Sequence, residues 1–137
     1  MSEPAALYEK NDGIALVTMN RPEVRNALNT EMLCLLADAW QDINDDPAVR
    51  VAVFTGAGDK AFCAGADLDK FIPVMQGRRP PENEWDERIL KDIPLIYKGL
   101  LRNYRVYKPI IAAVRGFAFA GGTEMLTCTD ILVASED

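Results

Sequence analysis

Two apolar segments, each followed closely by small residues, constrain the fold of this chain more than any other feature of its sequence. The run at 51–54 precedes AFCAGADL at 61–68, and the run at 110–114 precedes GFAFAGGTE at 116–124. Continuous apolar runs of this length are typical of strands that are buried on both faces of a parallel sheet. Because ligands bind where such strands end, the pattern predicts an α/β fold with two loops at one ligand site.

The N-terminal third of the sequence predicts a hairpin followed by a helix. Residues 7–10 and 14–19 read as two strands, and the Asn-Asp-Gly sequence at 11–13 favours a turn between them. Thr30 is the expected N-cap of a helix whose apolar residues recur at helical spacing and which should end within 44–47.

Helix-like and strand-like segments alternate further along the chain, which is the pattern of crossover connections in an α/β fold. We predict an exposed loop at 71–84, a mostly helical stretch at 85–107 with an interruption at Pro94, and a strand at 131–134. That last strand would leave an open sheet edge, which favours association with other chains. We therefore expect residues 1–137 in isolation to be unstable or dependent on a partner.

Charge and hydropathy exclude two classes of partner. The 137 residues carry a formal net charge of −6, whereas a nucleic-acid-binding domain presents a basic face. No apolar run reaches the roughly 18 residues that span a bilayer, and residues 1–6 lack the pattern of a signal peptide. We expect neither a nucleic-acid partner nor a membrane span.

The rare residue types restrict the chemistry. The sequence contains no histidine, which removes Ser-His-Asp and Cys-His catalysis and the commonest zinc ligand, so we expect no metal. Its three cysteines lack CxxC spacing, which indicates free thiols in a reducing compartment and a cytoplasmic location. Proton transfer must then use carboxylates, lysines, tyrosines or cysteines.

The two small-residue loops suit an anionic ligand oxygen. Small side chains let a ligand approach the backbone, and the first N–H groups of a helix lack an internal acceptor. Two such N–H groups that converge on one oxygen form an oxyanion hole. Tight packing of the chain is the alternative explanation, and the residues alone favour it.

Three motifs, in order, resemble the crotonase (enoyl-CoA hydratase/isomerase) superfamily. NRP at 20–22 with RNAL at 25–28 is similar to its N-terminal signature, and AFCAGADL at 61–68 is similar to its first active-site signature. KPIIAAVRG at 108–116, running into AGGTE at 120–124, resembles the second.

This resemblance covers essentially the whole chain and implies an α/β fold with a crotonase-like ββα spiral core. A complete subunit of the family is much longer. We therefore expect residues 1–137 to be the N-terminal part of a single spiral domain, truncated after Asp137, with the remaining core and the C-terminal helices absent.

The resemblance also implies a binding site. The thioester carbonyl would lie between the backbone N–H groups of Ala66 and Gly121. Arg25 would lie near the CoA phosphates, with an ordinary exposed loop arginine as the alternative. The other residues that would contact substrate, largely through backbone groups, are Ala64, Asp67 and Leu68.

Glu124 matches the first of the two acidic residues of enoyl-CoA hydratases. Its implied role is general acid/base catalysis, in which it orients or deprotonates the water that adds across the 2,3-double bond. Phe117, Phe119 and Met125 are expected to supply the apolar surroundings that such a carboxylate needs. The alternative is a glutamate that the helix N-terminus favours for its dipole alone.

Further residues near these motifs also carry expectations. We expect Asp67 to be a helix cap or loop tie, and Cys63 to be a buried small thiol rather than a nucleophile. The loop arginines Arg78 and Arg79 are expected to be solvated. Ala120 replaces the glycine that begins a Gly-Gly-Gly run in many relatives, and we expect this change to be mild because the next glycine is retained.

The resemblance implies a lyase of fatty acid metabolism, an enoyl-CoA hydratase that adds water to a 2-enoyl-CoA through an enolate held in the oxyanion hole. Alternatives are an enoyl-CoA isomerase, another crotonase enzyme such as a hydrolase or decarboxylase, and an inactive acyl-CoA-binding module. They stay open because the second acidic position lies beyond Asp137. Coenzyme A would be part of the substrate with no separate cofactor, and the full-length form would be a homotrimer or hexamer.

Overall fold

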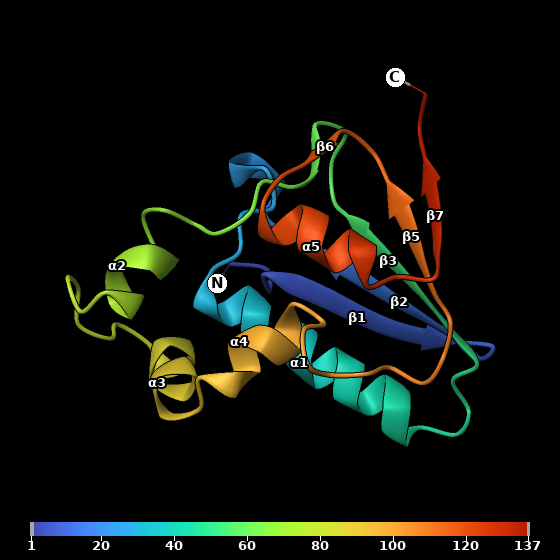
Figure 1. The fold of residues 1–137 in the computed structure, drawn as a ribbon, viewed down its shortest axis with the longest axis horizontal. Helices are drawn as coiled ribbons and strands as arrows, with labels where there is room; N and C mark the ends of the chain where they lie inside the picture. The colour runs from blue at the N-terminus through green and yellow to red at the C-terminus, as the bar shows by residue number, and fades with distance from the viewer. Residues whose placement is uncertain (1, 137) are drawn as a thin grey trace.

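A five-stranded sheet forms the centre of the computed structural model, which describes residues 2–136 (Figure 1). In spatial order its strands are β1 (Ala6–Asn11), β2 (Ile14–Met19), β3 (Val51–Gly56), β5 (Ile110–Val114) and β7 (Ile131–Ala134). β1 and β2 pair antiparallel, and the other neighbours pair parallel. The predicted hairpin, both buried strands and the last strand are confirmed. The ends of the predicted domain, Met1 and Asp137, lie outside the described residues.

A small parallel sheet and five α-helices complete the fold. The small sheet pairs β4 (Ala61–Cys63) with β6 (Phe117–Ala118). Within residues 2–136 the α-helices are α1 (Thr30–Asp45), α2 (Phe71–Met75), α3 (Glu84–Lys91), α4 (Pro94–Gly99) and α5 (Gly121–Thr127). A 3₁₀ turn, η1 (Pro22–Val24), precedes α1. No helix within residues 2–136 has both the length and the apolar character that crossing a membrane requires.

Helix α1 organises the main core. It packs against β1 and β2 on one side, and α3 and α4 lie against it on the other (Figure 1). Trp40 of α1 meets Phe54 of β3 edge-on with ring centroids 5.0 Å apart, and Phe54 meets Phe62 of β4 at 5.2 Å. These edge-on aromatic contacts link the helix, the main sheet and the small sheet in one core.

The cap of α1 differs from the prediction by one residue. Asn29 is the N-cap, because its backbone is extended and its Oδ1 accepts from the Met32 N–H at 2.9 Å. Thr30 is already helical, and its hydroxyl donates instead to the buried Asp86 Oδ1 at 2.7 Å.

The segment between β4 and β5 differs from its prediction at both ends. The exposed loop expected at 71–84 is wrong at its start, where α2 buries Phe71 and Val74. The helical stretch expected at 85–107 is interrupted near Pro94 as predicted, but it ends at Gly99. Residues 100–107 are irregular, and Leu101 within them has a positive φ of 59°.

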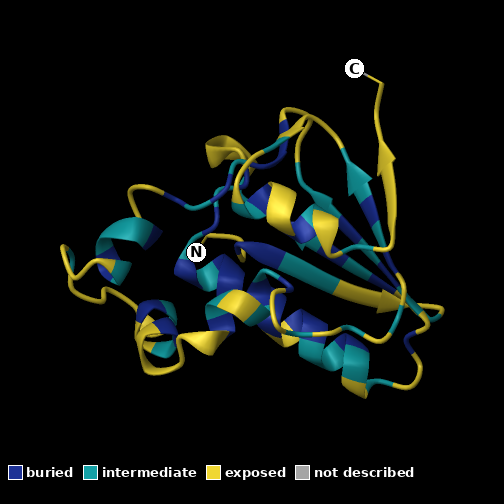
Figure 2. Cartoon of the chain, in the orientation of Figure 1, coloured by how far each residue is buried: buried dark blue, intermediate teal, exposed yellow. Residues whose placement is uncertain are grey.

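Strand β7 has little cover in the described structure. Figure 2 shows it exposed along its length, and its Ile131, Leu132 and Val133 side chains are all more than half exposed. β7 is the edge strand of the sheet, as the sequence predicted.

Gly99 lies where α4 packs closely on α1, so we expect a side chain at this position to be destabilising. A Cβ at this position would lie 2.6 Å from the Leu33 carbonyl oxygen, and the Gly99 carbonyl accepts from Trp40 Nε1 at 3.1 Å. We expect Gly99→Ala to lower the free energy of unfolding by about 1–3 kcal/mol, measured by urea denaturation. The control is Gly77→Ala, whose Cβ would meet nothing within 4 Å. It should cost only about 1 kcal/mol, through its positive φ. Equal losses in the two variants would contradict the contact at Gly99.

Candidate active site

The two small-residue segments lie side by side. Ala61 pairs with Phe117 and Cys63 with Ala118, and the Phe119 N–H donates to the Cys63 carbonyl at 2.9 Å. The pairing continues the direction of β4 and β6 into the loops that follow them. Segments that are far apart in the sequence thus form one surface.

Glycines set how closely these two loops approach. A Cβ on Gly122 would lie 2.6 Å from the Cys63 carbonyl oxygen. A Cβ on Gly65 would lie 3.0 Å from the Ala120 Cβ and 3.7 Å from the Gly121 nitrogen. The backbones are therefore in direct contact, with no room for a side chain between them.

The structure brings together the two amides that the sequence predicted for the oxyanion hole. Around Ala66, the Leu28 N–H donates to the Gly65 carbonyl at 2.8 Å and the Asp67 N–H donates to the Leu28 carbonyl at 2.9 Å. This alternation turns the Ala66 N–H away from Leu28. Within residues 2–136, the N–H groups of Ala66 and Gly121 have no acceptor.

Ala120 holds a strained conformation directly before the second amide. Its φ of 46° and ψ of −118°, with the Gly122 N–H donating to the Phe119 carbonyl at 2.8 Å, describe a type II′ turn. That position of the turn favours glycine, and an L-residue there costs on the order of 1–3 kcal/mol. The expectation that alanine is a mild replacement is therefore wrong, because it considered the retained glycine and not the backbone of Ala120.

Asn26 fastens the N-terminal motif to the first loop, a role that the sequence analysis did not assign. This fully buried side chain accepts from the Arg21 N–H at 2.9 Å. Its Nδ2 donates to the carbonyls of Ala57 at 2.9 Å and Ala61 at 3.0 Å. Its positive φ of 55° suits asparagine. The sequence pattern that could have indicated this role is an asparagine between a basic and an apolar residue in a turn.

Arg25 lies beside this tie on the surface. Its carbonyl accepts from the Ala64 N–H at 2.9 Å, while its side chain is exposed. With Gly58, Asp59 and Lys60 it lines a hollow of about 170 Å³. The guanidinium is thus near the first small-residue loop and accessible to an anion.

Asp67 is a structural tie, as predicted. Its Oδ2 accepts from Arg21 Nη1 at 2.8 Å, and its Oδ1 accepts from the N–H groups of Asp69 at 3.0 Å and Lys70 at 2.8 Å. Burial raises the pKa of this carboxyl, but the hydrogen bonds outweigh burial and hold the pKa below its ordinary value. Leu68, the next residue, is 75% exposed and free to contact a ligand.

Glu124 does not have the apolar surroundings that were expected. Its carboxylate is 47% exposed, and Oε2 accepts from Arg102 Nη1 at 3.2 Å. Met125 is buried beneath the helix, but Phe117 and Phe119 are exposed and pack on each other with ring centroids 4.9 Å apart. The aromatic side chains follow β6 outward, so they leave the carboxylate in solvent.

Arg79 corrects a second expectation. Its side chain is only 15% exposed, and it pairs with the Asp86 carboxylate, 1% exposed, at 2.7 Å. It also donates to the Lys70 carbonyl at 2.6 Å, so it joins both ends of the segment that contains α2. Arg78 is exposed, as expected.

Cys63 is a buried thiol, as predicted. Burial raises its pKa to about 11, although the Gly65 N–H lies 3.4 Å from Sγ. A thiol with this pKa carries almost no thiolate near neutral pH, so it is a poor nucleophile.

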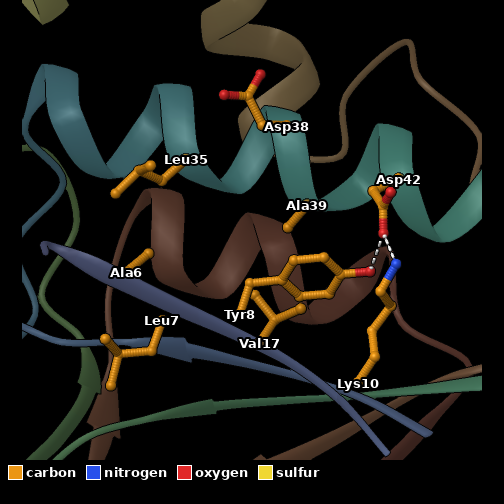
Figure 3. A pocket seen from close by; sticks show the side chains of 9 residues that line it. All are labelled: Ala6, Leu7, Tyr8, Lys10, Val17, Leu35, Asp38, Ala39 and Asp42. Atoms are coloured by element: carbon orange, nitrogen blue, oxygen red, sulfur yellow. Dashed lines mark hydrogen bonds and ion pairs between the residues drawn. The ribbon is translucent and has the colours of Figure 1, made fainter.

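A separate hollow between β1 and α1, of about 390 Å³, lies outside the candidate site (Figure 3). Asp42 accepts from both the Tyr8 hydroxyl and Lys10 Nζ at 2.7 Å, and Lys10 also pairs with Asp46 at 2.8 Å. Desolvation and the Asp42 contact raise the pKa of Tyr8. Asp38 also lines the hollow and pairs with Arg88, so each charged side chain of the lining has a partner within the described residues. Residues 2–136 also contain no grouping of acidic and cysteine side chains suited to a metal.

The structure is an α/β protein in which two unpaired amides follow two paired parallel strands. Solved structures share this fold. A carnitinyl-CoA hydratase from Mycobacterium avium superposes with a TM-score of 0.78 at 34% identity, covering 97% of this chain and 47% of that chain. The mixed α/β fold expected from the sequence, with its crotonase-like core, is thereby confirmed.

Residues 9–137 match the family described as enoyl-CoA hydratase/isomerase, and the chain belongs to that family. The enoyl-CoA hydratase EchA19 of Mycobacterium tuberculosis is 44% identical over 135 residues, 98% of this chain and 48% of the relative. A crotonyl-CoA hydratase of Syntrophomonas wolfei is 39% identical over 132 residues, 96% of this chain and 46% of the relative. The chain thus spans about half the length of the relatives it matches.

The Asp67 tie predicts a pH-dependent stability. A depressed pKa contributes stability that is fully present above the pKa of an unfolded aspartate, about 3.9, and is lost as pH falls through the folded-state pKa. Asp67→Asn should lower the free energy of unfolding at neutral pH by about 2–3 kcal/mol and flatten its decline in acid, as urea denaturation at several pH values would measure. Asp69→Asn removes the same charge from an exposed neighbour, and an equal effect in that control would refute the tie.

Burial also predicts the order of cysteine reactivity. Cys128 is exposed, whereas Cys34 and Cys63 are buried and each has a pKa raised to about 11 by desolvation. Iodoacetamide near neutral pH should alkylate Cys128 first, as peptide mass spectrometry would detect. Early labelling of Cys63 would be inconsistent with a buried thiol and would reopen its role as a nucleophile.

Proposed function

We propose that this chain binds an acyl-CoA thioester with its carbonyl oxygen between the N–H groups of Ala66 and Gly121, as part of an enoyl-CoA hydratase-type enzyme. The observation that carries the proposal is that, within residues 2–136, both motif-matched amides are unpaired and belong to segments in direct backbone contact. Relatives named enoyl-CoA hydratase and crotonyl-CoA hydratase support the reaction class.

The oxyanion hole supplies the main stabilisation in this proposal. When water attacks C3 of a 2-enoyl-CoA, the electron pair of the double bond moves through C2 onto the thioester oxygen and forms an enolate. Two fixed N–H donors stabilise that oxygen more than they stabilise the neutral carbonyl, and each is worth a factor of about 10²–10³ in turnover. Protonation at C2 then gives the 3-hydroxyacyl-CoA.

Glu124 is the proposed general acid/base. Arg102 engages Oε2, and within the described residues Oε1 has no partner, so one oxygen remains free to accept a proton from water. In this proposal Arg102 orients the carboxylate from outside the substrate site.

Substrate recognition would use the surface of the first loop. Arg25 is placed for the CoA phosphates, where a guanidinium makes charge-assisted hydrogen bonds. The 64–68 segment, with its exposed Leu68, would contact the rest of coenzyme A through backbone groups and apolar surface. Coenzyme A then arrives as part of the substrate, no separate cofactor is needed, and the enzyme would work as a homotrimer or hexamer in the cytoplasm.

The proposal is tested by separating binding from turnover. With crotonyl-CoA, Glu124→Gln should lower the rate of enoyl absorbance loss about 10²–10⁴-fold while changing acyl-CoA affinity only about 2-fold. The control, Glu9→Gln, alters an exposed carboxylate on β1 and should leave both unchanged.

Gly121→Pro removes the donor N–H and should abolish both turnover and tight binding. Proline suits the first position of a helix, but it disfavours the conformation that Ala120 holds before it. Full activity in this variant would refute the hole. Binding without turnover that Glu124→Gln leaves unchanged would identify an acyl-CoA-binding module instead of an enzyme.

A further inference from the structure

The peptide unit between Ala120 and Gly121 has two roles at the candidate site. The peptide between Ala120 and Gly121 contributes the unpaired Gly121 N–H on one side. On its other side, its carbonyl, from Ala120, accepts from the Glu124 N–H at 2.9 Å and closes the first turn of α5. The orientation of this single plane therefore fixes both the proposed oxyanion donor and the start of the helix that carries Glu124.

A second orientation of this plane is stereochemically available. Rotating the peptide by about 180° converts a type II′ turn into a type I′ turn and keeps the hydrogen bond between the Gly122 N–H and the Phe119 carbonyl. Ala120 would then enter the left-handed helical region. This chain already places another non-glycine residue there, since Arg25 has φ 56° and ψ 35°.

The residue types on either side of the peptide permit this rotation. The type I′ turn requires a positive φ at the position of Gly121, which glycine adopts at little cost. The present II′ turn requires Ala120 to hold a conformation suited to glycine. Rotation would relieve the strain at Ala120, but it would also break the hydrogen bond between the Glu124 N–H and the Ala120 carbonyl. These two contributions to the free energy have opposite signs and similar sizes, so the two orientations are close in free energy.

We propose that Ala120 is a positioning residue that makes the Ala120–Gly121 peptide a two-state element, with the Gly121 N–H directed into the oxyanion hole in only one of the states. The inference rests on the proposed function for the role of that N–H. An enolate oxygen stabilises the hole-forming state, whereas alanine at position 120 favours the other. A glycine there removes the opposition, so the hole-forming state becomes dominant before ligand binds.

The first test detects the two states without any ligand. In ¹⁵N relaxation dispersion of the chain, the Gly121 and Glu124 amides should show microsecond-to-millisecond exchange, because one is reoriented and the other loses its acceptor. Ala120→Gly should quench this exchange and raise the melting temperature by about 2–5 °C. The matched control, Asp12→Gly, changes another positive-φ residue in the β1–β2 turn and should leave exchange at both amides unaltered.

The second test compares a charged ligand with a neutral one. Acetoacetyl-CoA can bind as an enolate, whose absorbance reports the anion, whereas butyryl-CoA presents a neutral thioester carbonyl. Ala120→Gly should tighten binding of the enolate about 3- to 10-fold and of butyryl-CoA less. Ala120→Ser, which keeps the Cβ and therefore the strain, should behave like the original chain.

The outcomes separate the two proposals. Absence of exchange at both amides, or exchange that Ala120→Gly leaves intact, would overturn the two-state peptide. Unchanged or weaker enolate binding in Ala120→Gly would overturn it as well. If neither thioester binds the original chain while the exchange is present and quenched as expected, the proposed function fails and the two-state peptide stands.

Discussion

Direct backbone contact between the segments after β4 and β6 is the constraint on which the rest of the structure depends. The Cys63 carbonyl oxygen lies only 2.6 Å from where a Cβ of Gly122 would be, so the approach tolerates no side chain. Parallel pairing of β4 and β6 sets the direction of both loops, and the main sheet sets the spacing of the strands that lead into them. The unpaired amides of Ala66 and Gly121 share one surface because of this contact.

The strands were predictable from sequence because their signals are local, whereas the errors arise from partners far away in the chain. Thr30 reads as an N-cap, but its hydroxyl serves Asp86, which leaves the cap to Asn29. Arg79 reads as solvated because it lies in a Pro-rich loop. Its side chain is mostly covered because the same Asp86 and the Lys70 carbonyl offer it partners that only the folded chain brings together.

In the candidate site, too, the features with local sequence signals were predictable and those that depend on distant partners were not. Motif spacing predicted Ala66 and Gly121. Close packing accounts for Gly122, and it leaves the binding explanation open because the two amides stay unpaired within the described residues. The surroundings of Glu124 were not predictable, because neighbours in sequence point outward and Arg102 comes from the irregular segment after α4. The strain at Ala120 was also hidden, since a residue type does not reveal its φ.

The order of the strands has a consequence for how the chain folds during synthesis. β1, β2, α1 and β3 form a contiguous block, but β3 obtains its second neighbour only when Ala52 pairs with Ile110 of β5. Until that stretch leaves the ribosome, one edge of β3 has no strand beside it, and closing so long a loop is entropically slow. The nascent chain is therefore most exposed to mispairing between completion of β3 and emergence of β5, an interval in which a chaperone would have most effect.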